Sequence, residues 1–177
     1  SAISSTLFPE LSRADSEGSD ETVSTLVSDA LAYNGLLIIP GLFGGGLLAS
    51  RLLRIYGPEF VQGSAVLWVL ILAALIYGYQ EQFMYAINAL NRPDIAFRVN
   101  AVFIISNVVL NIGLVAAFGV LGAAVATAIS ATLGLILSYF ALRSLISFHV
   151  PVIEIGKQFV AAVAMSGAVY ASQLLVS

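Results

Sequence analysis

The sequence predicts an all-α membrane protein, a polytopic bundle of transmembrane helices. Hydrophobic residues make up 59% of the 177 residues and charged residues only 10%, against about half and about a quarter in a typical soluble domain. Seven basic and ten acidic side chains cannot form a polar shell around this much apolar surface. The net charge of −3 also gives no basic surface for nucleic acid. Soluble enzymes, nucleic-acid-binding proteins and disordered chains are therefore excluded.

Uncharged stretches between the clustered charges predict five membrane-spanning helices. Residues 30–50, 60–80 and 158–177 are each uncharged, and residues 99–142 form a longer uncharged stretch. Because roughly 20 helical residues cross a bilayer core of about 30 Å, the longest stretch must contain two spans. Its centre, Phe118 to Gly122, reads FGVLG and predicts a tight turn, since glycine tolerates the backbone angles of a turn. The predicted spans are residues 27–48, 64–90, 96–117, 121–143 and 157–176.

Outside the spans, the sequence indicates a fragment of a larger transporter-like protein. The chain begins with Ser1 rather than methionine, and residues 1–8 are typical of the last turns of a preceding helix. We expect residues 1–177 to be a single transmembrane domain fragment, in which residues 9–26 form an acidic cytoplasmic linker. Six arginines stand against one lysine, and the loops are acidic. This composition is similar to that of proteins from salt-loving archaea, and it predicts a haloarchaeal or other prokaryotic cell membrane protein.

The positions of Arg and Lys predict the orientation, because cytoplasmic loops carry an excess of these residues. Five of the seven lie in, or at the span ends beside, the 9–26, 91–95 and 144–156 connections: Arg13, Arg92, Arg98, Arg143 and Lys157. The alternate group of connections holds Arg51 and Arg54. We therefore expect the first three connections to lie in the cytoplasm.

A polar stripe in the second predicted span holds the candidate substrate or ion pathway. Tyr77, Glu81, Tyr85 and Asn88 share one helical face. Glu81 lies ten residues before Asn91, about 15 Å along a helix and near the bilayer midplane. A lipid-facing carboxylate there would cost at least a few kcal/mol, so we expect it to face a cavity or a partner. The alternative is a shorter span, with Glu81 near the headgroups and the tyrosines in an interfacial belt.

Asparagines form a second stripe on the third span. Asn107 and Asn111 are four residues apart, and Asn100 lies seven residues before Asn107. Their amides could contact a polar ligand, or bond a neighbouring helix for roughly 1 kcal/mol each. Packing is the favoured interpretation, and Asn107 and Asn111 stay pathway candidates.

The fourth span carries small residues at steps of four, which predicts close helix packing because small side chains let backbones approach. These residues are Gly122, Ala126, Ser130, Gly134 and Ser138. Three arginines are weaker candidates for contacts to phosphates or to the membrane interface: Arg51, Arg54 and Arg98. Basic interfacial anchors are the more frequent case.

The residues contain no catalytic or metal-binding constellation, so we expect a protein that is not an enzyme. The chain has no cysteine and one histidine, His149, which lies in a predicted loop with no nucleophile pattern nearby. The glycines Gly44 to Gly46 lack the lysine and hydroxyl residue of a phosphate loop. No cofactor or metal is expected, and H⁺ or Na⁺ is a candidate coupling ion at Glu81.

An ordered set of motifs carries a family resemblance over nearly the whole chain. These are LFPELSR at residues 7–13, YGPEF at 56–60, AINALNRP at 86–93, NVVLN at 107–111 and FGVLGAAVAT at 118–127. The succession resembles the C-terminal half of polysaccharide biosynthesis membrane proteins. These are lipid-linked oligosaccharide flippases of the multidrug/oligosaccharidyl-lipid/polysaccharide exporter superfamily.

The resemblance implies the C-terminal lobe of a MATE-like flippase fold, with two pseudo-symmetric lobes around a central cavity. It also implies that the missing N-terminal lobe of the same protein is a partner, together with the lipid bilayer and a lipid-linked glycan. Key cationic residues of such flippases often lie in the first lobe, so no position here inherits their role. If the five predicted spans are roughly the ninth to thirteenth helices of that fold, the odd or even position of each span also implies that residues 9–26 lie in the cytoplasm.

The leading hypothesis is therefore a transporter that moves a lipid-linked oligosaccharide across the membrane by alternating access, for surface polysaccharide or glycoprotein glycan assembly. Three alternatives remain open. A cation-coupled multidrug exporter of the same superfamily would need a more aromatic and acidic cavity. A non-transporting membrane scaffold subunit would tolerate replacement of Glu81 by leucine. A membrane-embedded glycosyltransferase is disfavoured, because no acidic cluster for a metal–phosphate site stands at a span end.

Overall fold

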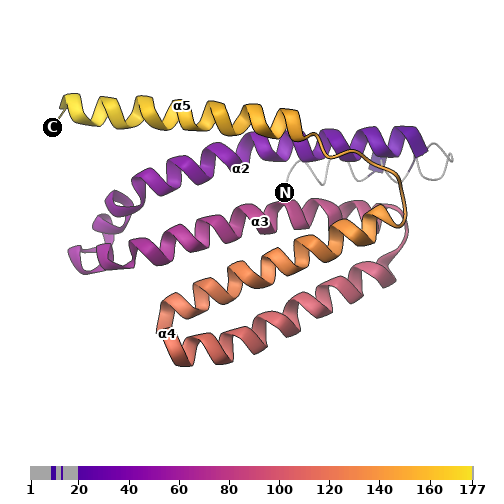
Figure 1. The fold of residues 1–177 in the computed structure, drawn as a ribbon, viewed down its shortest axis with the longest axis horizontal. Helices are drawn as coiled ribbons and strands as arrows, with labels where there is room; N and C mark the ends of the chain where they lie inside the picture. Colours follow the sequence, from indigo (N-terminus) through magenta and orange to yellow (C-terminus); the bar gives the residue numbers. More distant parts are fainter. Residues whose placement is uncertain (1–8, 11–12, 14–19, 177) are drawn as a thin grey trace.

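The computed structural model describes residues 9–10, 13 and 20–176, and this part of the chain is a set of long helices (Figure 1). In chain order they are α2 (Asp20–Tyr56), the short 3₁₀ helix η1 (Pro58–Gly63), α3 (Ser64–Ala89), α4 (Pro93–Arg143) and α5 (Val152–Val176). Helix α5 lies beside α2, α2 beside α3, and α3 beside α4. Four of these helices are long and apolar enough to cross a membrane. The expected helix end at residues 1–8 lies outside the described residues.

Helix α4 is a hairpin of two helical arms joined at Gly119. That residue has φ 60° and ψ −137°, a non-helical conformation with positive φ that glycine adopts without a steric penalty. The chain reverses there, so that both arms run along the bundle (Figure 1). The turn therefore lies within the FGVLG segment, and one long helical element contains both predicted spans.

The buried apolar core lies at one end of the bundle. Side chains from the start of α2, the end of α3 and both ends of α4 meet there, among them Val23, Leu31, Phe83, Ile87 and Leu142. The connections at residues 90–92 and 144–151 are at the same end, on the right in Figure 1. This is the end that the arginine positions assign to the cytoplasm.

Polar side chains also join the helices, as expected where water and the hydrophobic effect contribute little. The amide of Asn34 in α2 donates to the Gly78 carbonyl of α3 at 3.1 Å. The amide of Gln158 in α5 donates to the Ala32 carbonyl of α2 at 2.8 Å. The Ser28 hydroxyl donates to the carbonyl of His149 at 2.7 Å and so holds the loop before α5.

Helix α2 begins at Asp20, so the last part of the 9–26 segment predicted as a linker is helical. Two features favour an early start. Glu21 in the first turn interacts favourably with the helix dipole, and Val23, Val27 and Leu31 repeat every four residues to form a buried face. Helices α2 and α5 extend beyond the spans predicted within them, while α3 ends one residue short of residue 90. Helices extend past a bilayer core, so the span limits themselves stay predictions.

Candidate functional site

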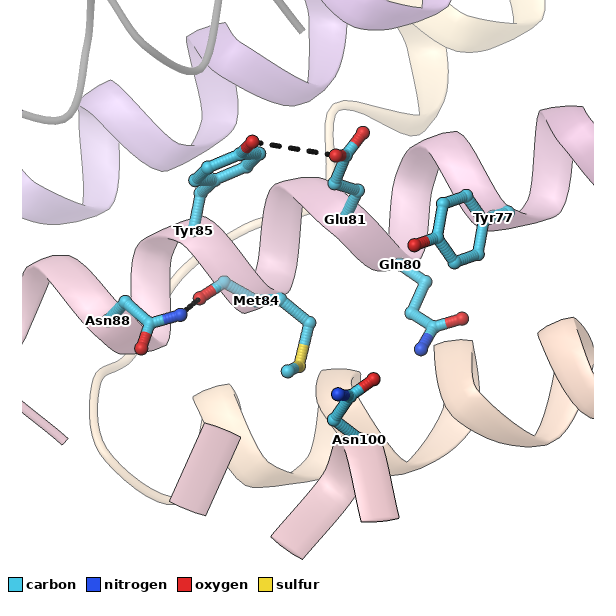
Figure 2. Close-up of a pocket in the computed structure, with 7 residues that line it drawn as sticks. All are labelled: Tyr77, Gln80, Glu81, Met84, Tyr85, Asn88 and Asn100. Atoms are coloured by element: carbon cyan, nitrogen blue, oxygen red, sulfur yellow. Dashed lines mark hydrogen bonds between the residues drawn. The ribbon is translucent and has the colours of Figure 1, made fainter. Parts of the chain in front are cut away.

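A polar pocket of about 230 Å³ opens between α3 and the first arm of α4. Its lining is Tyr77, Gln80, Glu81, Met84, Tyr85, Asn88 and Asn100. Six of these residues come from consecutive turns of α3, and Asn100 comes from α4 (Figure 2). All four members of the predicted stripe, Tyr77 to Asn88, therefore line one pocket. Their role in transport stays a prediction.

Glu81 and Tyr85 form one wall of the pocket. The Tyr85 hydroxyl donates to Glu81 Oε1 at 3.5 Å, a long hydrogen bond between consecutive turns. Asn88 donates its amide to the carbonyl of Met84 at 2.8 Å, which leaves its side-chain oxygen as an acceptor. Tyr77 packs on Phe103 of α4 with ring centroids 5.8 Å apart. This wall thus presents a carboxylate and hydroxyl groups to the pocket.

The depth of Glu81 follows from the length of α3. The helix ends at Ala89, eight residues after Glu81, which corresponds to about 12 Å. A helix of 26 residues is about 39 Å long and exceeds a 30 Å core by roughly 4–5 Å at each end if centred. Glu81 then lies about 7–8 Å inside the core boundary, between the midplane and the headgroup positions that the sequence left open.

Gln80 and Asn100 form the other wall. Asn100 belongs to the predicted asparagine stripe, whereas the sequence did not single out Gln80 as a site residue. Gln80 is 3% exposed, and its Oε1 atom is buried without a hydrogen-bond partner. In Figure 2, Gln80 and Met84 extend toward the side where Asn100 approaches, whereas Glu81 and Tyr85 extend the other way. The QEQ sequence at residues 80–82 contained the signal, since a glutamine in an apolar helix needs a polar neighbour.

Gly134 in the second arm of α4 makes room for the Gln80 side chain. A Cβ atom added at Gly134 would lie 2.5 Å from Gln80 Nε2 and 2.6 Å from both Oε1 and Cδ. Gly134 belongs to the predicted packing stripe, and the structure buries every residue of it: Gly122, Ala126, Ser130, Gly134 and Ser138.

The other predicted candidates lie outside the pocket. Asn111 donates its amide to the Asn107 carbonyl at 2.9 Å and to Asn107 Oδ1 at 3.1 Å, so these two side chains interact along their own helix. Arg51 and Arg54 are exposed at the end of α2, and Arg98 is exposed near the start of α4. None of the three lines the polar pocket.

The electrostatics of the pocket favour hydrogen-bond donors over anions. Glu81 is the one charged residue among its lining residues, and the remainder are amides, phenols and a methionine. Within the described part of the chain, no group of three or more His, Asp or Glu side chains is placed to hold a metal ion. A second cavity of about 350 Å³ lies where α2, α3, the second arm of α4 and the start of α5 meet, and its exposed lining is apolar. The first pocket exposes polar groups and is therefore the candidate site for a polar headgroup.

An ion pair holds the turn between α3 and α4. Arg92 Nε lies 3.4 Å from Asp94 Oδ1, and both side chains are about half exposed. Desolvation raises the pKa of Asp94, but the hydrogen bond and charge of Arg92, with two backbone hydrogen bonds, outweigh it and lower that pKa below its usual value.

Comparison with known proteins gives one family. The family model "Lipid II flippase MurJ" matches residues 1–176. The chain is 39% identical over 168 residues to the "Probable flippase AglR" of Haloferax volcanii, covering 93% of this chain and 35% of that protein. It is 30% identical over 176 residues to a "Probable low-salt glycan biosynthesis flippase" of the same organism, covering 99% of this chain and 37% of that protein. The chain thus spans about a third of the length of these relatives.

The fold has a solved counterpart. The structure titled "Lipid II flippase MurJ, inward closed conformation" superposes with a TM-score of 0.81 at 19% identity, over 96% of this chain and 36% of that one. This family is narrower than the exporter superfamily indicated by the motifs. The superfamily name and a specifically MATE-like fold stay predictions.

Proposed function

The chain belongs to the family of the lipid II flippase MurJ, and from that premise we propose that it is part of a transporter that moves a lipid-linked oligosaccharide across the membrane. The observation that carries the proposal is the family match over residues 1–176. The protein is a multi-pass membrane protein, and the glycan flippases among its relatives point to a glycan-bearing substrate. The relatives give no support to drug export or to a scaffold role.

The polar pocket supports a pathway for a hydrophilic headgroup through this part of the membrane. Burying an ionisable side chain inside a bilayer is costly, so such groups face a cavity or a partner. Glu81 lines a pocket with Tyr77, Tyr85 and Asn88, and these groups can accept and donate hydrogen bonds to sugar hydroxyls. The glycan would pass along this surface while its lipid tail stays in the bilayer.

Transport by alternating access is the mechanism that we propose for the whole protein. In transporters of this kind, lobes rock around a site near the bilayer midplane. With α3 centred in the bilayer, Glu81 lies about 7–8 Å inside the nearer core boundary, between that boundary and the midplane site of such transporters. Glu81 is also the proposed position for a coupling H⁺ or Na⁺, since it is the one carboxylate that lines the pocket.

The test is a translocation assay with a full-length transporter that contains this chain. The protein is reconstituted into liposomes with fluorescent lipid-linked oligosaccharide, and a membrane-impermeant reagent reports the headgroups in the outer leaflet. Glu81→Gln is compared with Glu154→Gln, a matched change at an exposed residue paired with Lys157 at 2.7 Å. Both variants are first matched for folding and insertion.

We expect wild type and Glu154→Gln to translocate the lipid and Glu81→Gln to lose most of the rate. Equal rates in all three proteins would keep the flippase function and remove Glu81 from the pathway. No translocation by wild type under any ion gradient or membrane potential would refute the proposed function.

A further inference from the structure

Gln80 is buried in an apolar helix and its amide oxygen has no partner, as is also true of the Tyr79 hydroxyl and Gln158 Oε1 among the described residues; of the three residues, Gln80 lines the polar pocket. The residue is 3% exposed, and Oε1 is fully covered without a hydrogen bond. An unsatisfied buried acceptor is unfavourable, so such groups in native proteins call for a donor that arrives from elsewhere. The side chain lines the polar pocket, so a rotation of its amide away from Gly134 would present Oε1 to a donor in that pocket.

We propose that Gln80 and Asn100 form a sugar subsite, in which Gln80 Oε1 accepts a hydrogen bond from an uncharged, hydroxyl-bearing sugar of the headgroup. This inference rests on the proposed function and deepens it. The two amides approach the pocket from different helices, α3 and α4 (Figure 2). An amide both donates and accepts, as does a sugar hydroxyl, so a pair of amides suits a sugar ring.

The charges of the pocket argue against the other headgroup component, the phosphate. Neither lysine nor arginine lines the pocket, and the carboxylate of Glu81 lies on its opposite wall. A phosphate would be repelled by that carboxylate and would find no cation to pair with. An amide oxygen can also ligate a cation such as Na⁺, and the Glu81 carboxylate lines the same pocket. A sugar hydroxyl and a cation are therefore distinguished by the Na⁺ arm of the experiment below.

Gly134 is the positioning residue for this subsite. The second arm of α4 approaches Gln80 so closely that a Cβ atom at Gly134 would lie 2.5 Å from Nε2. The glycine thus leaves room for the Gln80 amide against the second arm of α4. Gly134→Ala leaves Gln80 chemically intact but displaces its amide. This variant therefore tests whether the position of the Gln80 acceptor matters, whereas Gln80→Met tests whether the acceptor itself is needed.

The experiment is photo-crosslinking on the full-length transporter in lipid nanodiscs. The first probe is dodecyl β-maltoside with a diazirine on its sugar, and the second is dodecyl phosphate with a diazirine at the head end of its chain. Mass spectrometry measures labelling of peptides that contain residues 77–100. The variants are Gln80→Met, which keeps the side-chain volume, Asn100→Leu at an exposed position, and Gly134→Ala. The matched control is Gln62→Met, an exposed glutamine of η1.

We expect the maltoside to label these peptides in wild type and Gln62→Met, and about fivefold less in Gln80→Met and Gly134→Ala, the size of one lost hydrogen bond. Asn100→Leu should also reduce labelling, and it keeps the test valid if Gln80→Met fails to fold. The phosphate probe should label weakly in every protein.

Three outcomes would overturn the subsite. The first is equal maltoside labelling in Gln80→Met and wild type, and the second is labelling by the phosphate probe that is as strong as labelling by the maltoside. The third is loss of maltoside labelling with added NaCl but not with KCl at equal ionic strength, which indicates a Na⁺ site.

The liposome assay separates the subsite proposal from the proposed function. Translocation by wild type without an effect of Gln80→Met on labelling refutes the subsite alone, and labelling as expected without translocation refutes the proposed function alone.

Discussion

Gly122→Ala should strongly destabilise the α4 hairpin. A Cβ atom at Gly122 would overlap the carbonyl group of Leu114 and lie 3.0 Å from the Val115 nitrogen. An ordinary contact begins at 3.4 Å, so the nitrogen alone requires a shift of about 0.4 Å, and the carbonyl requires more. Overpacking typically costs 1–3 kcal/mol. Because these are backbone atoms that no side-chain rotation can move, we expect a loss of about 3 kcal/mol, at the upper end of that range.

Gly113→Ala is the matched control on the first arm of the same hairpin. A Cβ atom at Gly113 has no neighbour within 4 Å, so the change should be neutral or stabilise the helix by up to about 1 kcal/mol. The free energy of unfolding is measured by titrating SDS into mixed micelles of the full-length protein. If Gly122→Ala unfolds within about 0.5 kcal/mol of wild type while Gly113→Ala behaves as expected, the close approach of the two arms is refuted.

Two further predictions concern the buried stripe and the turn. Ser130 is fully buried, so Ser130→Leu should lower the free energy of unfolding by about 1–3 kcal/mol. The control Thr132→Leu, at an exposed position, should alter the free energy of unfolding by less than about 0.5 kcal/mol. Equal effects of the two changes would contradict the packing role of Ser130. The folded-state pKa of Asp94 is below its usual value of 3.8. The stabilisation that it gains from Arg92 is therefore present above pH 3.8 and is lost as the pH falls through the lower folded-state pKa. The stability difference between wild type and Asp94→Asn should shrink over that interval, and a difference independent of pH would refute the assignment.

Helical periodicity predicted which polar residues share a face of α3, but not the full extent of the pocket. Tyr77, Glu81 and Tyr85 follow steps of four and line it together. Gln80 precedes Glu81 by one position, about 100° around the helix, so a single-face pattern leaves it out. The pocket includes both because it extends around α3 toward α4. Tertiary packing decides which helix covers which side of α3, and the helical periodicity of the sequence carries no information about that packing.

The asparagine stripe shows a second limit of sequence patterns. Asn107 and Asn111 are spaced to face a neighbouring helix or a ligand, yet the amide of Asn111 bonds to the backbone and side chain of Asn107. Hydrogen bonds to neighbouring residues of the same helix compete with bonds to distant groups for such side chains. The local bonds form without bringing distant parts of the chain together. In contrast, the turn at Gly119 was predictable because a 44-residue uncharged stretch must reverse and few residues other than glycine tolerate positive φ.

The chemistry of the pocket implies that different surfaces contact the sugar and the phosphate of a lipid-linked headgroup. A lipid-linked glycan joins uncharged sugars to an anionic phosphate, and no single surface suits both parts. The amide wall of Gln80 and Asn100 suits sugars, while all six arginines of the chain are exposed and lie outside the pocket: Arg13, Arg51, Arg54, Arg92, Arg98 and Arg143. Charge attraction acts over about 8–10 Å at ordinary ionic strength, whereas a hydrogen bond requires contact. Under the proposed function, arginines would therefore attract the phosphate without touching the sugar, and the choice between glycans would fall to the amides of α3 and α4.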